Sequence, residues 1–328
     1  MNMNTSNNSA KGTDPLEPLP SAATPRPGVR RLDLKVGFRC NNLCDFCAQG
    51  DKRETYPQRP FSELRDEMKR AREAGITSIV FTGGEPSLHS DILELVREAR
   101  TLGFTALQLQ TNGRRLAYEK FCRELLEAGI TEASPSLHGS KSEIHDALTC
   151  APGAFAQTVR GILNVRRLGI PTLINSVVTA QNYRDLPALA RLLISLHVNQ
   201  FQFAFIHIVG RPAANPSEVV PRKTDAIPYI HQGLSLARQA GVRAYTEAVP
   251  FCLMRGFEDC VAETIMPDAR VADVGRVIEH YEDYRWTEGK AKGPRCAVCV
   301  YDKVCEGPWR EYPELFGWDE FVPVPRKS

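Results

Sequence analysis

The amino-acid sequence predicts an α/β fold with a parallel sheet, and two patterns along residues 31–247 support this. An apolar strand, a loop and an amphipathic helix recur in that order, and such alternation produces parallel strands joined by crossover helices. Each of five predicted helices also ends at a glycine followed by Ile, Phe or Val, as is typical of a helix C′ position. These glycines are Gly75, Gly103, Gly129, Gly169 and Gly241.

The strands can be placed in chain order from these helix ends. The first is the apolar run 32–38, and each helix-ending glycine introduces another strand. We expect these strands at 76–81, 104–110, 130–137, 170–178 and 242–246, with one more near 200–208 after a helix at about 184–196. Six βα units and a trailing strand favour a partial (βα)6 barrel of the TIM type. An open doubly wound sheet is the alternative.

Unusual polar residues, glycines and cysteines fall directly after the predicted strands or late in them. In chain order they are Cys40–Cys47, 82–86, 111–113, Ser136 with His138, Asn175 with Ser176, and Gly210. In a parallel barrel the carboxyl ends of the strands share one mouth, where active sites form. This placement therefore favours the barrel over the open sheet.

The composition is that of a soluble globular protein. The 328 residues are 42% hydrophobic and 24% charged, with a net charge of +2, which gives no sign of a nucleic-acid or membrane partner. We find no apolar run of membrane-spanning length and no secretory signal, so we expect a cytoplasmic protein. Thiols stay reduced there, and ten cysteines indicate metal or redox chemistry rather than disulfides.

Both ends of the sequence differ from its centre. Residues 1–28 are rich in Asn, Ser, Pro and Thr and are expected to form a disordered tail. From about residue 248 the periodicity weakens, and Cys, Trp, Pro and Tyr occur at close intervals. Because a region of this size has a weak core, we expect a metal to stabilise it. The predicted division is a tail at 1–28, a barrel at 29–247 and a Cys-rich region at 248–328.

Three cysteines directly after the first strand are the strongest chemical signal. Cys40, Cys44 and Cys47 stand at x3 and x2 spacing, so their thiolates can hold one soft metal centre. A closed structural site takes four protein ligands. Three ligands therefore indicate an iron–sulfur cluster or a metal with one open position, and a zinc or plain Cys-rich site is the alternative.

This stretch, with Phe46 directly before the third cysteine, is similar to the signature of radical S-adenosylmethionine (radical SAM) enzymes. The resemblance covers about residues 31–247. It implies that Cys40, Cys44 and Cys47 hold a 4Fe–4S cluster whose fourth iron binds S-adenosylmethionine (AdoMet). Reductive cleavage of AdoMet would then give a 5′-deoxyadenosyl radical that abstracts hydrogen from an unactivated carbon. Phe46 would pack near the adenine, with a plain core role as the alternative.

Further cofactor-binding residues are implied by the same resemblance. Gly83-Gly84-Glu85-Pro86 resembles the family's second signature, in which glycines allow close backbone approach to a ligand and Glu85 would accept a hydrogen bond from the AdoMet ammonium. Polar groups in the third- to fifth-strand segments would reach the methionyl carboxylate and the ribose, with local capping as the alternative. They are Thr111, Asn112, Ser136 and Asn175. We expect a structural role for His138.

The late cysteines form a second motif. Cys296, Cys299 and Cys305, followed by Gly-Pro-Trp, resemble the C-terminal auxiliary-cluster domains called SPASM and twitch. A full cluster needs a fourth ligand; Cys252 is the first candidate and Cys260 the second. A full SPASM domain has another cysteine where this chain has Trp309, so we expect one auxiliary 4Fe–4S cluster, with a zinc ribbon as the alternative. The two remaining cysteines, Cys122 and Cys150, are not expected to be ligands.

The expected function is that of a radical SAM oxidoreductase. A ribosomal peptide that is oxidised, crosslinked or epimerised is the first substrate class, and a small natural-product intermediate, as in twitch-type dehydrogenases, is the second. A non-catalytic metal-binding scaffold is a remote alternative. An electron donor such as flavodoxin or ferredoxin is implied. The molybdenum-cofactor cyclase has different C-terminal cysteine spacing and a Gly-Gly-Arg tail, so its activity is not expected here.

Overall fold

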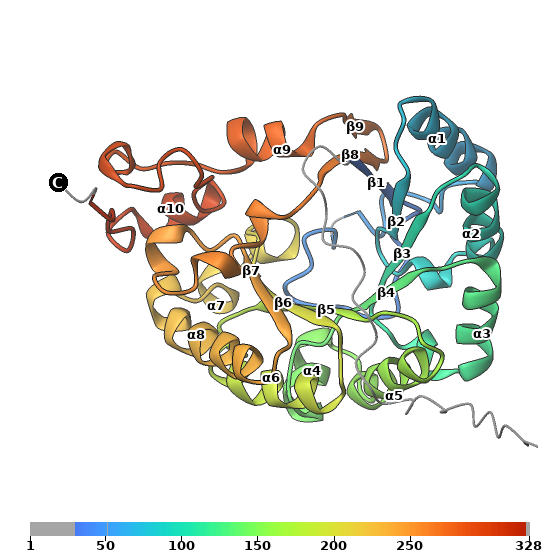
Figure 1. Cartoon of the computed structure of the whole chain (residues 1–328), viewed down its shortest axis with the longest axis horizontal. Coiled ribbons are helices and arrows are strands. Elements are labelled where there is room, and N and C mark those ends of the chain that lie inside the picture. Colours follow the sequence, from blue (N-terminus) through green and yellow to red (C-terminus); the bar gives the residue numbers. More distant parts are fainter. Residues whose placement is uncertain (1–29, 51, 326–328) are drawn as a thin grey trace, which may run out of the picture.

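The computed structural model describes residues 30–50 and 52–325, so the predicted tail at 1–28 lies outside the described residues. Parallel strands form a curved wall with helices on its outer side (Figure 1). The strands are β1 Arg30–Lys35, β2 Ser78–Thr82, β3 Ala106–Thr111, β4 Glu132–Pro135, β5 Leu173–Val178, β6 Gln200–Phe205, β7 Arg243–Glu247, β8 Asp268–Asp273 and β9 Arg276–Ile278. The helices of the barrel are α1 Phe61–Glu73, α2 Ile92–Thr101, α3 Glu119–Ala128, α4 Ser142–Thr149, α5 Ala154–Arg167, α6 Leu186–Ser195, α7 Pro216–Val219 and α8 Lys223–Gln239.

The order of the strands confirms the barrel prediction. β1 to β4 are sequential parallel neighbours in one sheet, and β5 to β7 are sequential parallel neighbours in another. Parallel bridges from Ala133 to Thr172 and from Ser136 to Asn175 join β4 to β5. A doubly wound sheet reverses its strand order at a switch point. Seven strands in unbroken sequential order instead form a partial TIM-type barrel.

The helix-ending glycines behave as the sequence predicts. All five have positive φ, between 68° and 111°. At Gly129, for example, the left-handed backbone lets its N–H bond back to the carbonyl groups of Leu125 and Leu126 at the end of α3. Such a turn ends the helix and returns the chain toward the next strand.

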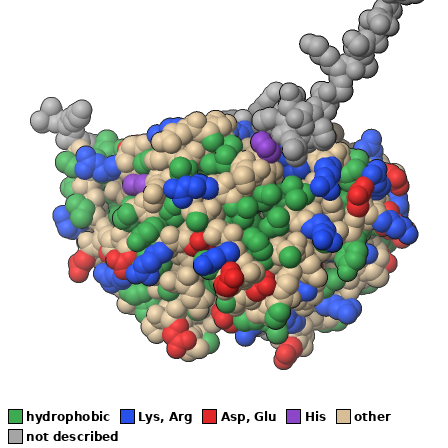
Figure 2. All heavy atoms as spheres, turned by 90° about the horizontal axis from the view of Figure 1, so that it is seen from below, with side chains coloured by type: hydrophobic (Ala, Val, Ile, Leu, Met, Phe, Trp, Pro, Cys, Tyr) green, Lys and Arg blue, Asp and Glu red, His purple; other side chains and the backbone are tan. Residues whose placement is uncertain are grey.

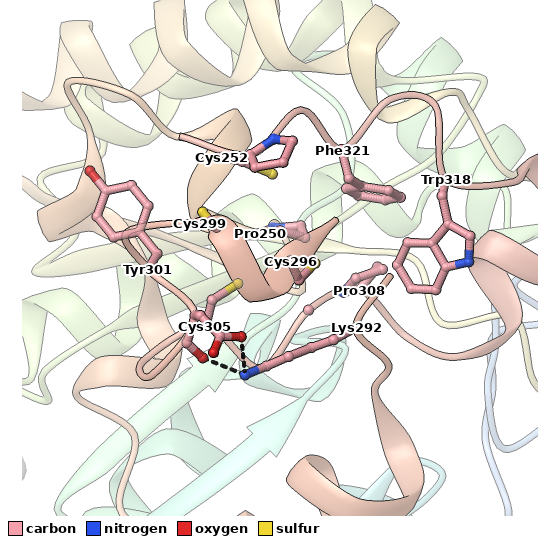
Figure 3. Close-up of a pocket in the computed structure, with 13 residues that line it drawn as sticks. Pro250, Cys252, Lys292, Cys296, Cys299, Tyr301, Cys305, Pro308, Trp318 and Phe321 are labelled. Carbon is pink, nitrogen blue, oxygen red and sulfur yellow. Dashed lines mark hydrogen bonds and ion pairs between the residues drawn. The ribbon is translucent and has the colours of Figure 1, made fainter. Parts of the chain in front are cut away.

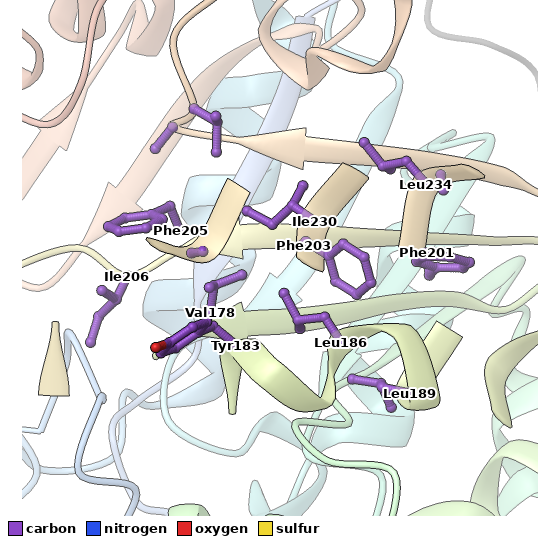
Figure 4. Close-up of a cluster of buried hydrophobic side chains, with 14 of the residues drawn as sticks. Val178, Tyr183, Leu186, Leu189, Phe201, Phe203, Phe205, Ile206, Ile230 and Leu234 are labelled. Carbon is purple, nitrogen blue, oxygen red and sulfur yellow. The ribbon is translucent and has the colours of Figure 1, made fainter. Parts of the chain in front are cut away.

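Two apolar cores lie between the strands and the helices. One joins β1–β4 to α1–α3 and includes Leu34, Phe81 and Leu95, each fully buried. The other, shown in Figure 4, joins β5–β7 to α6 and α8 and includes Phe203 and Ile230. Burial of each such side chain contributes about 1.5–3 kcal/mol. Since these residues face the helices, the alternating positions along each strand face the barrel interior.

An unpredicted strand extends the wall beyond β1. Residues of β8 pair in parallel with β1, so that Leu32 lies beside Arg270 and Leu34 beside Ala272. β9 then pairs antiparallel with β8. Residues 268–278 thus belong to the barrel's sheet, although they fall in the segment predicted as the separate region 248–328. The boundary at 247 stays a prediction.

The remaining C-terminal residues are mostly turns and loops. They contain α9 Tyr281–Tyr284, a π-helical turn at Arg285–Gly289 and α10 Glu311–Phe316. In Figure 1, α9 lies beside β8, and α10 lies on the side of α7 and α8. Among residues 30–50 and 52–325, no helix combines the length and apolar character needed to span a membrane. Figure 2 shows acidic and basic side chains interspersed on the face at the bottom of Figure 1, so this face has no large field of one sign.

Candidate functional site

The loop between β1 and α1 presents Cys40, Cys44 and Cys47 at the carboxyl end of the barrel. Neighbouring loops hold its backbone. Leu43 N donates to Thr149 O at 2.8 Å, which ties the loop to the end of α4. Arg211 N, after β6, donates to Cys47 O at 3.1 Å. The three cysteines are partly exposed, and Cys44 also packs against the edge of the larger apolar core.

The two glycines of the predicted second signature explain how closely this loop can pack. A Cβ at Gly83 would lie 2.3 Å from Gly37 O, and one at Gly84 would lie 2.3 Å from Phe38 O. Both contacts are closer than any side chain allows. Gly84 N also donates to Gly37 O at 2.8 Å. The glycines therefore make room for the backbone that leads into Cys40, in addition to any role in admitting a ligand.

The thiols fit a cluster better than a single ion. Within the described residues, no group of three His, Cys, Asp or Glu side chains is close enough to hold one metal ion. A cubane cluster instead distributes its cysteine ligands over separate irons, which needs a wider arrangement. Burial raises the pKa of Cys40 and that of Cys44, and the neighbouring cysteines raise the Cys44 pKa further. Asn42 N donates to Cys40 Sγ at 3.4 Å, a bond that favours the thiolate.

Glu85 lies at the centre of a buried hydrogen-bond group. Its carboxylate accepts bonds from Thr111 Oγ1 at 2.6 Å, from Asn112 N at 2.6 Å and from Ser87 N at 3.0 Å. Burial raises its pKa despite these donors. A carboxylate offers about four acceptor positions, so one remains for a ligand. The sequence predicts ligand contacts for Glu85 and Thr111, and it did not anticipate that these two residues bond to each other.

The predicted polar residues that follow β3 and β4, together with Asn175 within β5, also lie at this mouth. Asn112 Nδ2 donates to Asn41 Oδ1 at 2.6 Å and lies 3.9 Å from Cys40 Sγ, so Asn112 belongs to the surroundings of the cysteine loop. Ser136 and Asn175 are bridge partners. The buried Asn175 Oδ1 has no hydrogen-bond partner among the described residues, which leaves an acceptor for a bound molecule.

Phe46 and His138 pack against each other. Their ring centroids are 4.5 Å apart in an edge-on arrangement, and Phe46 is buried in the larger core. His138 Nδ1 accepts a bond from Val177 N at 3.1 Å, and its carbonyl accepts one from Asn182 Nδ2 at 2.8 Å. Burial holds the pKa of His138 well below its usual value. These contacts give His138 the structural hydrogen-bonding role that we expected.

Three arginines that sequence reasoning missed hold the outer side of the cysteine loop. Arg114 donates to Asn41 O, Arg53 to Asn42 O and Arg211 to Leu43 O. We call Arg53, Arg114 and Arg211 the arginine clamp. They follow different strands, and arginine is common in this sequence, so no local pattern distinguished them. Their convergence on three consecutive carbonyl groups appears only in the fold.

The late cysteines meet in a second pocket, shown in Figure 3. Cys252 lies on the turn after β7, and it lines the pocket with Cys296, Cys299 and Cys305. About 420 Å³ of space, part of it open to solvent, lies between the lining residues. Burial, together with the three other cysteines, raises the pKa of Cys252 to about 12. Four thiols around one space are a ligand set that a 4Fe–4S cluster accepts.

The alternative ligand lies elsewhere. Cys260 is buried outside the pocket lining, and its Sγ accepts a long contact of 3.9 Å from Arg238 Nη2. Trp309, at the position where a full SPASM domain has a further cysteine, is buried and stacks on His207 with ring centroids 4.0 Å apart. The described geometry therefore brings Cys252, and not Cys260, to the other three thiols.

A buried ion network connects this pocket to the barrel. Glu306, next to Cys305, accepts bonds from Arg285 Nε at 2.9 Å and from Lys290 Nζ at 2.9 Å. Lys290 also contacts Glu263, and each of these four side chains is at most 7% exposed. No sequence pattern predicted this network, because its members are spread over 44 residues and meet only through the fold.

Comparisons with known proteins identify the family of this chain. The Radical SAM superfamily profile matches residues 34–193. An AdoMet-dependent heme synthase of Oleidesulfovibrio alaskensis is 30% identical over 86% of this chain and 82% of its own length. A probable GTP 3′,8-cyclase of Methanopyrus kandleri is 30% identical over 51% of this chain and 54% of its own. The solved structure of anSMEcpe with bound AdoMet and the Cp18Cys peptide covers 86% of this chain and 89% of its own, with 18% identity and a TM-score of 0.62.

The chain belongs to the radical SAM superfamily. Membership of this family implies a 4Fe–4S cluster and AdoMet. The α/β partial barrel predicted from the sequence is confirmed. The likeness to anSMEcpe, at 18% identity, shows the fold alone.

Proposed function

We propose that this protein is a cytoplasmic radical SAM oxidoreductase that uses one auxiliary 4Fe–4S cluster to oxidise a small molecule. Cys40, Cys44 and Cys47 would hold the first cluster, which with AdoMet supplies a radical able to take hydrogen from an unactivated carbon. Cys252, Cys296, Cys299 and Cys305 would hold the second. The observation that carries the proposal is the meeting of four thiols, from two separate segments, in one pocket.

The binding of AdoMet is assigned to residues at the carboxyl ends of the strands. Glu85 keeps one acceptor position for the ammonium group, and Asn175 Oδ1 lacks a partner. Phe46, Thr111, Asn112 and Ser136 complete the proposed set. Gly83 and Gly84 contribute by letting the cysteine loop pack closely against the loop after β2.

A tetrapyrrole is the first candidate substrate. The heme synthase relative aligns over most of both chains, whereas the cyclase relative covers about half of each. The second candidate is a ribosomal peptide, because the fold resembles that of a structure with a bound peptide. A structural likeness at this identity carries less weight than a full-length sequence relationship, so the order of the two classes expected from sequence is reversed.

The test uses the reconstituted protein without air. Porphyrins with and without iron, and a short peptide encoded beside this gene, are each added with AdoMet and a reductant, and 5′-deoxyadenosine and modified substrate are measured. We expect a porphyrin to shift its visible absorption on binding and to increase 5′-deoxyadenosine formation. Stimulation by the peptide alone would favour the second class. Formation of no 5′-deoxyadenosine under any condition would overturn the enzymatic proposal.

The auxiliary cluster is tested separately. The Cys252→Ser variant should still form 5′-deoxyadenosine, because Cys40, Cys44 and Cys47 are untouched, but should not yield oxidised product. Full oxidation by this variant would show that electron return does not need the second pocket.

A further inference from the structure

Ala248, directly after β7, has a backbone conformation that is unusual for a residue with a side chain. Its φ is +58°, and the residue is buried. The left-handed region is strained for a residue with a Cβ, and such strain persists only where the surroundings hold it. The chain turns at this corner toward Cys252, which lines the second pocket (Figure 3). The conformation of Ala248 therefore affects where the Cys252 thiol lies.

Lys223, the first residue of α8, holds the carbonyl side of this corner. Its Nζ donates to Ala248 O at 2.9 Å, and Lys223 is 1% exposed. Nζ also lies over the ring of Phe205, 3.2 Å from the ring centroid. Burial lowers the pKa of Lys223 well below its usual value, but a neutral amine still donates a hydrogen bond. Because an apolar side chain would fill this place at lower cost, we attribute the lysine to the carbonyl group that it binds.

Glu263 holds the amide side of the corner and connects it to the other thiols. Its Oε1 accepts a bond from Ala248 N at 2.7 Å and another from Lys290 Nζ. Lys290 also pairs with Glu306 at 2.9 Å, and Glu306 is the residue after Cys305. These contacts therefore run from the corner to the segment that carries the other three thiols of the pocket.

We propose that Lys223 is a positioning residue of the second pocket. By holding Ala248 in its left-handed conformation, with Glu263 on the other side, it keeps Cys252 beside the thiols of residues 296–305. This inference rests on the proposed use of the pocket as a 4Fe–4S site. Glycine adopts a positive φ without strain, so Ala248→Gly should make Lys223 dispensable.

The test begins from the chain in which Cys40, Cys44 and Cys47 are changed to alanine, so that all bound iron belongs to the second pocket. This chain is the parent of every variant below. Release of iron to a chelator and the electron paramagnetic resonance spectrum of the reduced cluster are measured after reconstitution without air. Urea unfolding of the iron-free protein gives a measurement that does not depend on the metal.

The variants separate the corner from general effects on the fold. Lys223→Met removes the donor and keeps an unbranched side chain that suits the aromatic surroundings. It is combined with Ala248→Gly or, as the matched control, with His197→Gly. His197, just after α6, also has a positive φ, of 52°, but it is exposed. Glycine there relieves a similar strain away from the second pocket.

We expect Lys223→Met to release iron at least about tenfold faster than the parent, because residues that support metal ligands change affinity by about 10–100-fold. Its resonance spectrum should also change. Adding Ala248→Gly should restore slow release and the parent spectrum, whereas adding His197→Gly should restore neither. In the iron-free protein, Lys223→Met should lower the urea midpoint less when residue 248 is glycine.

Equal iron release and equal spectra in Lys223→Met and the parent would overturn the inference, as would equal rescue by the two glycine variants. If Lys223→Met did not fold alone, the variant with Ala248→Gly should fold and hold iron, and failure of that variant would count against the inference. A parent that bound no iron would instead contradict the proposed cluster. The urea comparison would then decide, because equal midpoint losses with alanine and glycine at residue 248 would show that Lys223 does not hold the corner.

Discussion

Gly84 N donates a hydrogen bond of 2.8 Å to the carbonyl of Gly37, and this bond joins the loop after β2 to the backbone that leads into Cys40. The contact is possible because Gly84 has no side chain that would collide with the backbone of residues 38 and 39. It links the two sequence signatures directly, since Glu85 N makes a similar bond of 2.8 Å to Arg39 O.

Gly84→Ala should therefore disrupt the cysteine loop. The added Cβ would lie 2.3 Å from Phe38 O and 2.6 Å from Arg39 O, and backbone atoms cannot move aside easily. We expect a loss of several kcal/mol in the free energy of unfolding and reduced iron retention. Gly75→Ala is the control: its φ is +79°, but nothing lies within 4 Å of the new Cβ, so the loss should be about 1 kcal/mol. Urea unfolding and iron analysis measure both, and equal losses would contradict the steric account.

Iron content should separate the two proposed clusters. We expect about eight irons in the reconstituted wild type and about four in a variant with Cys40, Cys44 and Cys47 changed to alanine. Cys252→Ala should lose the iron of the second pocket, whereas Cys260→Ala should keep it, because Cys260 does not line that pocket. If the triple variant held no iron, the second pocket would not be a cluster site.

Glu306→Gln should be strongly destabilising. The Glu306 carboxylate accepts bonds from Arg285 and Lys290, both about 1% exposed. Removing one member of a buried ion group leaves the remaining charges uncompensated, at a cost of about 3–5 kcal/mol. Glu124→Gln breaks an exposed pair with Lys120 and should cost less than about 1 kcal/mol. Chemical unfolding compares the two, and similar losses would show that the buried network contributes little.

Stability should fall in acid because of His145. Burial lowers the pKa of His145 to about 4, so the unfolded chain binds a proton that the folded chain does not. The stabilisation is complete above the usual histidine pKa near 6.5 and decreases as the pH falls from about 6.5 to 4, by about 3 kcal/mol in total.

His145→Asn tests this origin. The amide oxygen can replace His145 Nδ1 as the acceptor for His138 N, and it does not titrate. The difference in unfolding free energy between pH 7.5 and pH 5 should be smaller in the variant than in the wild type. An unchanged difference would assign the acid sensitivity to other groups.

Thr111→Val should weaken AdoMet binding. The variant removes the bond of 2.6 Å to Glu85 and leaves Gly113 N without its acceptor at 3.1 Å. We expect about 1–3 kcal/mol less stability and a higher Kd for AdoMet, measured by calorimetry. Thr105→Val, at an exposed position, is the control and should leave the Kd unchanged. An unaltered Kd in Thr111→Val would place Thr111 in a purely structural role.

The sequence was sufficient for the features that depend on local patterns. The helix-ending glycines gave the strand order, because glycine readily adopts the left-handed turn that ends a helix and so marks where the next strand begins. Cysteine spacing located both thiol groups. β8 could not be predicted, because a strand of six residues that pairs with one more than 230 residues earlier has no local signature. The arginine clamp and the Glu306 network also depend on long-range contacts between common charged residues.

The partnership of Glu85 with Thr111 shows a different limit. Both residues were correctly expected at the mouth of the barrel, since polar residues after parallel strands converge there. Their mutual bond depends on the spacing between β2 and β3 and on side-chain rotamers, which periodicity does not encode. Position was therefore predictable from sequence, whereas the hydrogen-bond partner was not.

The pairing of β8 with β1 has a consequence for how the chain can be divided. Without β8, β1 would present a row of unpaired backbone groups on its open side, which is a template for intermolecular strand addition. The C-terminal residues thus protect the first strand of the barrel, and the two parts should unfold together in one transition. A fragment that stops at residue 247 would be prone to aggregate, and the Cys-rich segment cannot be exchanged between enzymes as an autonomous module unless β8 stays with the barrel.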